Sequence, residues 1–120
     1  MLKIDKVEWG TIEINGKKYG QVLIVGEQVF ERDSEKLHQL FGTTHKIGDW
    51  EIEKLFSGNP ELIIIGTGWV GVLKISEELR AKSEKLMMEL KILETPKAME
   101  EYNRLVEQGK RVNALIHTTC

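Results

Sequence analysis

One stretch of the sequence has residue types and spacing that suggest nucleotide chemistry. Residues 66–71 read GTGWVG and match the dinucleotide fingerprint G-x-G-x-x-G directly after an apolar run. In dinucleotide-binding folds the helix begins within these glycines, so that its first N–H groups face the pyrophosphate. Here residues 69–75 (WVGVLKI) are a poor helix start, and a capped start lies only at Ser76. The nearest ribose-binding acid, Glu94, comes 28 residues after Gly66 instead of about 20. We therefore expect no dinucleotide site.

The same glycines allow a second interpretation, a small-molecule pocket. Gly66, Thr67 and Gly68 stand at the carboxyl end of an expected central strand, where open α/β sheets place their ligands. Thr95 begins the next strand–helix junction, and Asn103 lies in the helix that follows. These five residues are candidate ligand-binding residues for a small molecule or anion. The competing interpretation is that the glycines only permit an unusual backbone path and that Asn103 bonds a neighbouring loop.

The segment HTTC at residues 117–120 also carries reactive groups. His117 and Cys120 supply at most two zinc ligands, whereas a structural zinc site needs about four. His38 and His45 would have to converge on the same point, so we expect no metal. Cys120 as a nucleophile would need a positioned base and a lowered pKa, and a chain terminus is usually mobile. We interpret the segment as a polar strand end with an exposed thiol, and we expect no cofactor and no catalytic residues.

Composition narrows the class of protein. The 120 residues suffice for one α/β domain spanning residues 1–120. The net charge of −2, without a basic tail, argues against nucleic acid or a membrane surface as partner. No apolar run approaches the ~20 residues of a spanning helix, and no signal-peptide pattern or second cysteine is present, so we expect a cytoplasmic protein. Lys and Glu make up 29 of the 36 charged residues, which is typical of thermophile proteins. The three tryptophans are expected to pack in the core or at its edge.

The first third of the chain predicts β structure. Thr11–Ile14 alternates polar and apolar residues, and Asn15-Gly16 then supplies the dipeptide of a tight hairpin. Asp33 or Ser34 can cap a short helix that Gly42 ends. The expected elements are strands at residues 11–14, 19–25 and 28–31 and a helix at residues 34–41.

The remaining chain alternates helices and strands. Asp49 and Ser76 are expected N-caps, and Thr95 before Pro96 is a third helix start. Leu79, Leu86 and Leu90 recur at heptad-like offsets and are expected to form the buried stripe of one helix. The expected order is helix 50–56, strand 61–65, helix 77–90, strand 91–94, helix 97–108 with Gly109 as its C′ residue, and strand 111–116. Such alternation favours a largely parallel sheet, and with the hairpins it predicts a mixed α/β domain.

Several short segments occur in a distinctive order along the whole chain. They are Trp9-Gly10 before a hairpin, GTTHKIG before a capped helix, Gly66-Thr67-Gly68 after a strand, TPKAMEEYN from Thr95, and HTTC at residues 117–120. Together they resemble the Mth nine-three-eight-like domain family. The resemblance implies a three-layer α/β fold, with a mixed central sheet, helices on both sides and an additional β layer from the N-terminus. Gly71 is not part of the family pattern, and residues 30–33 lack the tryptophan pair of some relatives.

The resemblance also bears on function. The family includes an adipogenesis-associated protein of animals and a mitochondrial complex I assembly factor, and it implies no settled catalytic activity. We therefore favour a non-catalytic interaction or assembly-type factor with an unknown protein partner. The alternative is a small-molecule binder or enzyme with a pocket at Gly66-Thr67-Gly68. An exposed apolar patch or a self-association surface would support the first hypothesis. The oligomeric state stays open.

Overall fold

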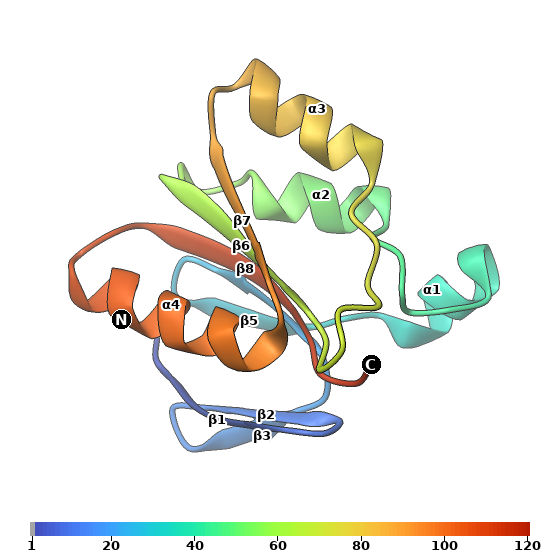
Figure 1. Cartoon of the computed structure of the whole chain (residues 1–120), viewed down its shortest axis with the longest axis horizontal. Coiled ribbons are helices and arrows are strands. Elements are labelled where there is room, and N and C mark those ends of the chain that lie inside the picture. The colour runs from blue at the N-terminus through green and yellow to red at the C-terminus, as the bar shows by residue number, and fades with distance from the viewer. Residues whose placement is uncertain (1) are drawn as a thin grey trace.

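The computed structural model describes residues 2–120, which form two β-sheets and four α-helices (Figure 1). The strands are β1 (Ile4–Glu8), β2 (Thr11–Ile14), β3 (Lys17–Tyr19), β4 (Val22–Val25), β5 (Gln28–Glu31), β6 (Leu62–Thr67), β7 (Glu89–Leu93) and β8 (Val112–His117). The helices are α1 (Ser34–Phe41), α2 (Asp49–Leu55), α3 (Glu77–Lys85) and α4 (Thr95–Glu107). Within this described part of the chain, every helix is too short or too polar to cross a membrane.

The central sheet has five strands in the order β5-β4-β8-β6-β7. β6 lies between β8 and β7 and pairs with both in parallel, whereas β4 pairs antiparallel with β8 and with β5. β1, β2 and β3 form a separate antiparallel sheet, in which Ile12 lies opposite Val7 on one side and Tyr19 on the other. The expected mixed sheet with an additional N-terminal β layer is therefore confirmed.

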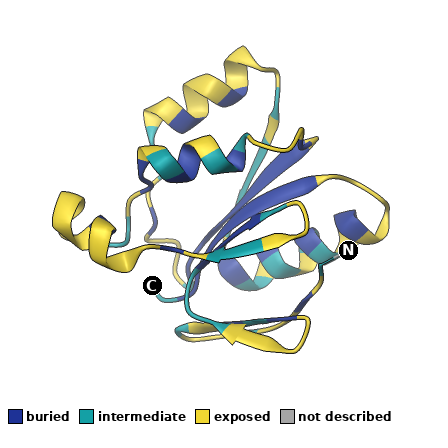
Figure 2. Ribbon diagram, turned by 180° about the vertical axis from the view of Figure 1, so that it is seen from behind, coloured by how far each residue is buried: buried dark blue, intermediate teal, exposed yellow. Residues whose placement is uncertain are grey.

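Both faces of the central sheet are covered, which gives the fold its three layers. α4 and the three-stranded sheet lie on one side, and α2 and α3 lie on the other (Figure 1). β6 is buried along its whole length because it faces both sides: Ile64 joins the α4 core and Ile63 joins the α2–α3 core. Figure 2 shows that burial is concentrated on the central strands and on the inner faces of the helices.

α4 is the helix that the sequence specifies most clearly. Ala98, Tyr102 and Leu105 recur at helical spacing on its buried face and pack against the central sheet. Pro96 lies in its first turn, where a missing N–H costs nothing. The helix ends at Glu107, and Gly109 follows with a φ of 82°, as the C′ assignment predicts.

Some boundaries differ from the sequence expectations. The strand expected at residues 19–25 is two strands, because Gly20 and Gln21 carry the chain from the small sheet into the central one. Residues 4–8 form β1, which the sequence analysis did not assign. Gly48, and not Asp49, is the N-cap of α2. Glu94, and not Thr95, is the N-cap of α4.

The long helix expected at residues 77–90 ends at Lys85, so its expected leucine stripe is wrong. Met87 has a φ of 52°, and this left-handed residue reverses the chain into β7. Leu79 is buried as expected, but Leu86 is 52% exposed and Leu90 belongs to β7. Local leucine spacing could not reveal the reversal, because Met87 is not a residue type that favours positive φ.

Candidate functional site

The carboxyl end of β6 brings four of the five candidate site residues together. The Gly68 N–H donates to Thr95 Oγ1 (2.9 Å), and the Thr95 N–H donates to the Gly68 carbonyl (3.0 Å). Thr95 Oγ1 in turn donates to the His117 carbonyl (2.5 Å), and Thr67 Oγ1 donates to a carbonyl at the end of β7 (3.2 Å). A Cβ on Gly66 would lie 3.3 Å from Thr95 Oγ1, so β6 and α4 approach closely.

Residues 119 and 120 fill the space beside this cluster. The amides of Trp69 and Val70 donate to the carbonyls of Thr119 and Cys120 at 2.8 and 2.9 Å. Gly68 has a φ of 105°, and a Cβ there would lie 2.2 Å from the Cys120 carbonyl carbon. Only glycine fits this conformation and this contact. The backbone N–H groups of residues 68–70 therefore bond to the chain itself.

Asn103 lies apart from that cluster. Its side chain accepts from the Ile4 N–H (2.9 Å) and donates to the Ile4 carbonyl (2.7 Å). Both polar ends of the amide thus engage one residue of β1, and Asn103 ties α4 to the small sheet. This is a bond to a neighbouring segment, one of the two roles that the sequence left open.

The residues of the HTTC segment occupy different environments. His117 is fully buried, whereas Cys120 is a partly buried free thiol. His45 packs edge-on against the His117 ring, with the ring centroids 5.2 Å apart. Among residues 2–120, no three His, Cys, Asp or Glu side chains are grouped closely enough to hold a metal ion.

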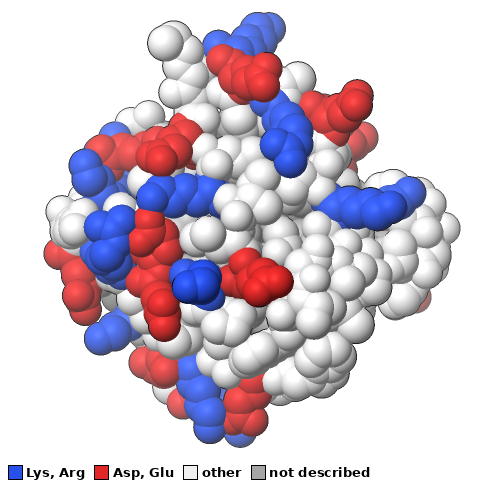
Figure 3. Space-filling model, viewed as in Figure 1, with Lys and Arg blue, Asp and Glu red and all other residues white. Residues whose placement is uncertain are grey.

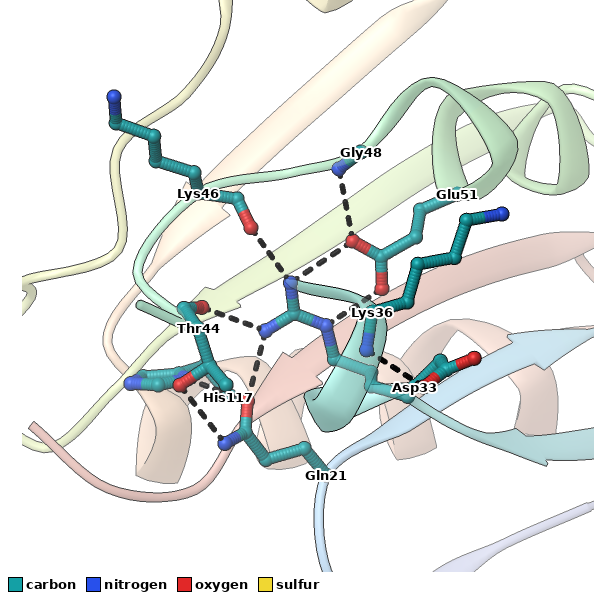
Figure 4. A network of polar contacts seen from close by, with 9 residues as sticks. Gln21, Asp33, Lys36, Thr44, Lys46, Gly48, Glu51 and His117 are labelled. Carbon is teal, nitrogen blue, oxygen red and sulfur yellow. Dashed lines mark hydrogen bonds and ion pairs between the residues drawn. The ribbon is translucent and has the colours of Figure 1, made fainter. Parts of the chain in front are cut away.

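A buried ion pair joins Arg32, which follows β5, to Glu51 in α2 (Figure 4). Arg32 Nε and Nη2 donate to the two Glu51 oxygens at 2.7 and 2.9 Å. Nη1 donates to Gln21 Oε1 (2.8 Å) and to the Thr44 carbonyl (3.0 Å), and Nη2 also donates to the Lys46 carbonyl (2.8 Å). All five guanidinium hydrogens therefore have partners, and none is left for a ligand.

Glu51 has a second role at the start of α2. Its Oε1 accepts from the Gly48 N–H (3.0 Å), as a glutamate three residues after an N-cap does in a capping box. The Trp50 ring packs so closely that a Cβ on Gly48 would lie 2.4 Å from it. Sequence reasoning missed this arrangement by placing the cap at Asp49. No local pattern signals the Arg32 partner, which is 19 residues away.

The buried network also fixes the state of His117. Its Nδ1 lies 2.6 Å from Gln21 Oε1, which already accepts from Arg32, so Nδ1 must be the protonated nitrogen. Its Nε2 then accepts from the Thr119 hydroxyl (3.1 Å). Burial, with smaller contributions from Arg32 and His45, lowers the pKa of His117 to about 4. The ring is therefore neutral at neutral pH and both of its nitrogens are engaged.

Exposed apolar side chains gather near residues 118–120. Trp9 is 61% exposed, Val70 is 67% exposed and Val72 is 36% exposed. We call these three residues the apolar patch. Figure 3 shows few charged side chains in the region of residue 120, whereas acidic and basic side chains are intermixed over α4. The expectation that Trp9 packs in the core or at its edge is wrong.

The apolar patch is held by backbone hydrogen bonds. The Gly10 N–H donates to the Thr118 carbonyl (2.9 Å), and this bond anchors the turn that carries the Trp9 side chain. The N–H groups of Val70 and Val72 both donate to the Cys120 carbonyl, at 2.9 and 3.2 Å. Two segments far apart in sequence are thus fixed to the same three residues, and the patch is preorganised.

Two further unusual groups lie close to the loop that carries Val70 and Val72. The indole N–H of Trp69 is buried without a partner, and within residues 2–120 no other buried side-chain nitrogen or oxygen is in this state. Such groups are rare in folded proteins and each calls for an explanation. The Glu94 carboxylate lies beside Gly71, 3.6 Å from where a Cβ would stand. An acidic group therefore borders the apolar surface.

Two of the clefts lie near the ends of the central strands. One of about 550 Å³ runs between β7 and α4, and one of about 200 Å³ lies beside Gln21 and Arg32. Neither cleft is lined by Gly66, Thr67 or Gly68.

These features define a three-layer α/β protein with a closed polar network and an apolar surface at the carboxyl edge of its sheet. A family model described as a protein of unknown function (DUF498/DUF598) matches residues 4–117, and the chain belongs to that family. The resemblance to the Mth nine-three-eight-like domain family is thereby confirmed, since solved structures of that kind are similar over nearly the whole chain.

Three solved structures illustrate the similarity. A conserved hypothetical protein from Pyrococcus horikoshii is 29% identical, with a TM-score of 0.85 over 98% of this chain and 99% of its own. MT938 is 27% identical, with a TM-score of 0.78 over 100% of both chains. A Mth938-like domain protein from Bordetella pertussis is 17% identical, with a TM-score of 0.62 over 97% of this chain and 85% of its own, and shows the fold alone.

Proposed function

We propose that this protein is a non-catalytic interaction or assembly-type factor whose partner binds the apolar patch of Trp9, Val70 and Val72. The observation that carries the proposal is the exposure of these three side chains on a backbone that is already fixed. Exposed apolar surface marks interaction sites in soluble proteins, and tryptophan is enriched among residues that dominate binding energy. A preorganised surface also loses little conformational entropy on binding.

The state of the polar groups supports the same proposal. A general base must reach a proton of the substrate, but the His117 ring is fully buried and bonds only to groups of its own chain. An anion-binding arginine needs free donors, but those of Arg32 are all used within the chain. The buried network therefore has the character of a structural unit that joins the end of β5 to α2 and to β8.

The chemistry around the patch suggests the kind of partner. Trp9, Val70 and Val72 would take an apolar segment, and the Glu94 carboxylate at the border of this surface would favour a lysine or arginine beside it. The expected partner is thus a protein segment with an apolar anchor and one adjacent cation.

Site-specific photocrosslinking in cells tests the proposal. A photoreactive residue at position 70 is compared with one at position 40, because Val70 and Leu40 are similarly exposed (67% and 60%) and Leu40 lies in α1, outside the apolar patch. We expect one protein to be crosslinked from position 70 and not from position 40. The purified partner should then bind wild type and Leu40→Asp equally, and bind Val70→Asp more weakly. Identical crosslinks from both positions, or specific turnover of a metabolite by the purified chain, would contradict the proposal.

The convergence of Gly66, Thr67, Gly68 and Thr95 supports a second candidate, a small-molecule site at the carboxyl end of β6. A ligand there would have to displace residues 119 and 120 from their bonds to the loop. Thermal unfolding with a metabolite panel tests this candidate, because a ligand at 100 times its Kd adds about 2.7 kcal/mol of stability. A panel without any shift would count against it.

A further inference from the structure

The central sheet has an open edge at β7. β7 pairs with β6 on one side and is the last strand in the order of the sheet. An edge strand presents a row of backbone N–H and C=O groups to any strand that can approach it. The cleft of about 550 Å³ runs along β7, between this strand and α4, so the side of the edge that faces α4 is accessible.

The side chains next to this edge are unusual for a surface that faces only water. Leu86 is 52% exposed and Met87 is 93% exposed, and only Met88 separates them from β7. The cleft itself is lined by equal numbers of acidic and basic residues, namely Glu89, Glu100, Glu101, Lys91, Lys97 and Arg104. A ligand with a large net charge of one sign would not match such a lining, whereas a strand with both acidic and basic side chains would.

β7 is itself such a strand, and its sequence ELKIL fits a second copy of itself in one register. When a twofold axis perpendicular to the sheet relates two antiparallel strands, each residue lies opposite a residue whose number differs from its own by an even number. Centring the pair on Leu90 puts Glu89 opposite Lys91 of the second copy, and Lys91 opposite its Glu89. Leu90 then faces Leu90, and Met88 faces Ile92. Opposite charges across an antiparallel pair are stabilising.

The neighbouring registers lack this match. Centring on Glu89 sets two glutamates against each other, and centring on Lys91 sets two lysines against each other. Centring on Ile92 pairs Lys91 with Leu93 and leaves no charge pair. Register is set by such cross-strand patterns, so the charges of β7 select one alignment.

We propose that two copies of this chain associate through their β7 edges, antiparallel and centred on Leu90, so that the two central sheets become one continuous sheet. This inference rests on the backbone edge and charges of β7, not on Trp9, Val70 or Val72, and does not depend on the proposed function. The pairing places the start of each β7 beside the end of the other, which brings Leu86 and Met87 to the Leu93 end of the second copy. Backbone pairing thus supplies affinity and the charge pairs supply register.

The contact area is small, so the dimer is expected to be weak. Interfaces of this kind lie at the low end of the areas of specific contacts. Lys91 already bonds Glu101 in its own chain, with Glu89 at 4.0 Å. The glutamate of the second copy adds to an existing cluster of charges, and no new unpaired charge is buried.

Sedimentation equilibrium of the full chain over a wide concentration range tests the pairing with two single variants. Glu89→Lys places two lysine–lysine pairs across the axis, and Lys91→Glu places two glutamate–glutamate pairs there. Each variant alone should dimerise about tenfold more weakly than wild type. An equimolar mixture of the two should recover dimers, because each lysine then faces a glutamate. Glu35→Lys, a charge change on α1, is the matched control and should dimerise like wild type.

Three results would overturn the proposal. One is a wild-type chain that stays monomeric at every concentration. The second is a dimer that both variants leave intact. The third is a monomer whose β7 amides gain protection from hydrogen exchange only when an extended segment of another protein is added. Loss of dimers in each variant alone and their recovery in the mixture would support pairing through the β7 edge in the register centred on Leu90. Misfolding of either variant could not produce this recovery.

Discussion

Two regions lie close to β8 and differ in how their groups are partnered. In the buried network, every donor of Arg32 and both ring nitrogens of His117 are engaged within the chain. In the apolar patch, Trp9 and Val70 point into solvent on a backbone that residues 118–120 hold in place. The polar side chains that could do chemistry already form hydrogen bonds within the chain, whereas the apolar side chains of the patch are exposed to solvent.

This contrast separates stability from function. Groups whose polar atoms are fully partnered in the interior are expensive to change, because one lost partner leaves another unsatisfied. Exposed side chains that contact little can be changed with almost no effect on folding. Substitutions in the network should therefore lower stability, and substitutions in the patch should lower only binding.

The largest effect is expected for Arg32→Met. The change leaves the Glu51 carboxylate buried at 0% side-chain exposure without its cation and should lower the free energy of unfolding by about 3–5 kcal/mol. Denaturant unfolding measures the loss. The double variant Arg32→Met/Glu51→Leu should recover a large part of it, because no charge then stays buried alone. A single variant as stable as wild type would show that the pair is not part of the folded core.

The next effect concerns the pH dependence of His117. Its folded pKa of about 4 lies below the ordinary value of 6.5, so the unfolded chain binds this proton first as the pH falls. The stability that depends on a neutral His117 is fully present above pH 6.5. It declines by about 3 kcal/mol in total as the pH falls toward 4. Unfolding free energies measured across this range should fall for wild type and stay flatter for His117→Asn. Parallel curves would refute the assignment.

A smaller loss is expected for Thr95→Val. The change removes the acceptor of the Gly68 N–H and the donor to the His117 carbonyl, and should cost about 2 kcal/mol. Thr95→Ser keeps the hydroxyl and is the control. If the valine variant is as stable as the serine variant, the hydroxyl does not hold β6, α4 and β8 together.

The smallest effect on folding is expected for Val70→Asp. At 67% exposure this side chain contributes little packing, and the unfolding free energy should change by less than about 0.5 kcal/mol. Thermal unfolding of this variant beside wild type checks the value. A large loss would mean that the patch is part of the folded core and is not a surface kept free for a partner.

The elements with strong local signals could be predicted from the sequence. The apolar run of β6, the Ser76 cap of α3 and the Pro96–Gly109 limits of α4 each rest on chemistry within a few residues. The reversal at Met87 could not be predicted, because its positive φ follows from tertiary packing and not from residue type. The mixed three-layer arrangement followed from the order of elements and from family resemblance.

The candidate site was predicted in part. Gly68 and Thr95 do lie together, because the carboxyl ends of β6 and β7 adjoin at one edge of the sheet. The occupation of that edge by residues 119 and 120 was not predictable, since it depends on where β8 places the chain that follows it. The pairing of Arg32 with Glu51 was not predictable either, because the two residues are 19 positions apart and meet only in the folded chain. The exposure of Trp9 contradicts the usual expectation for a tryptophan, and local sequence carries no information about it.

The central claim is that the apolar patch, and not the buried network, is the working surface. The most direct test is the dissociation constant of the crosslinked partner, measured by titration calorimetry with purified proteins. We expect Val70→Asp to raise the constant by about tenfold or more. The folded double variant Arg32→Met/Glu51→Leu should bind like wild type. Unchanged affinity for Val70→Asp, together with lost affinity for the double variant, would contradict the account.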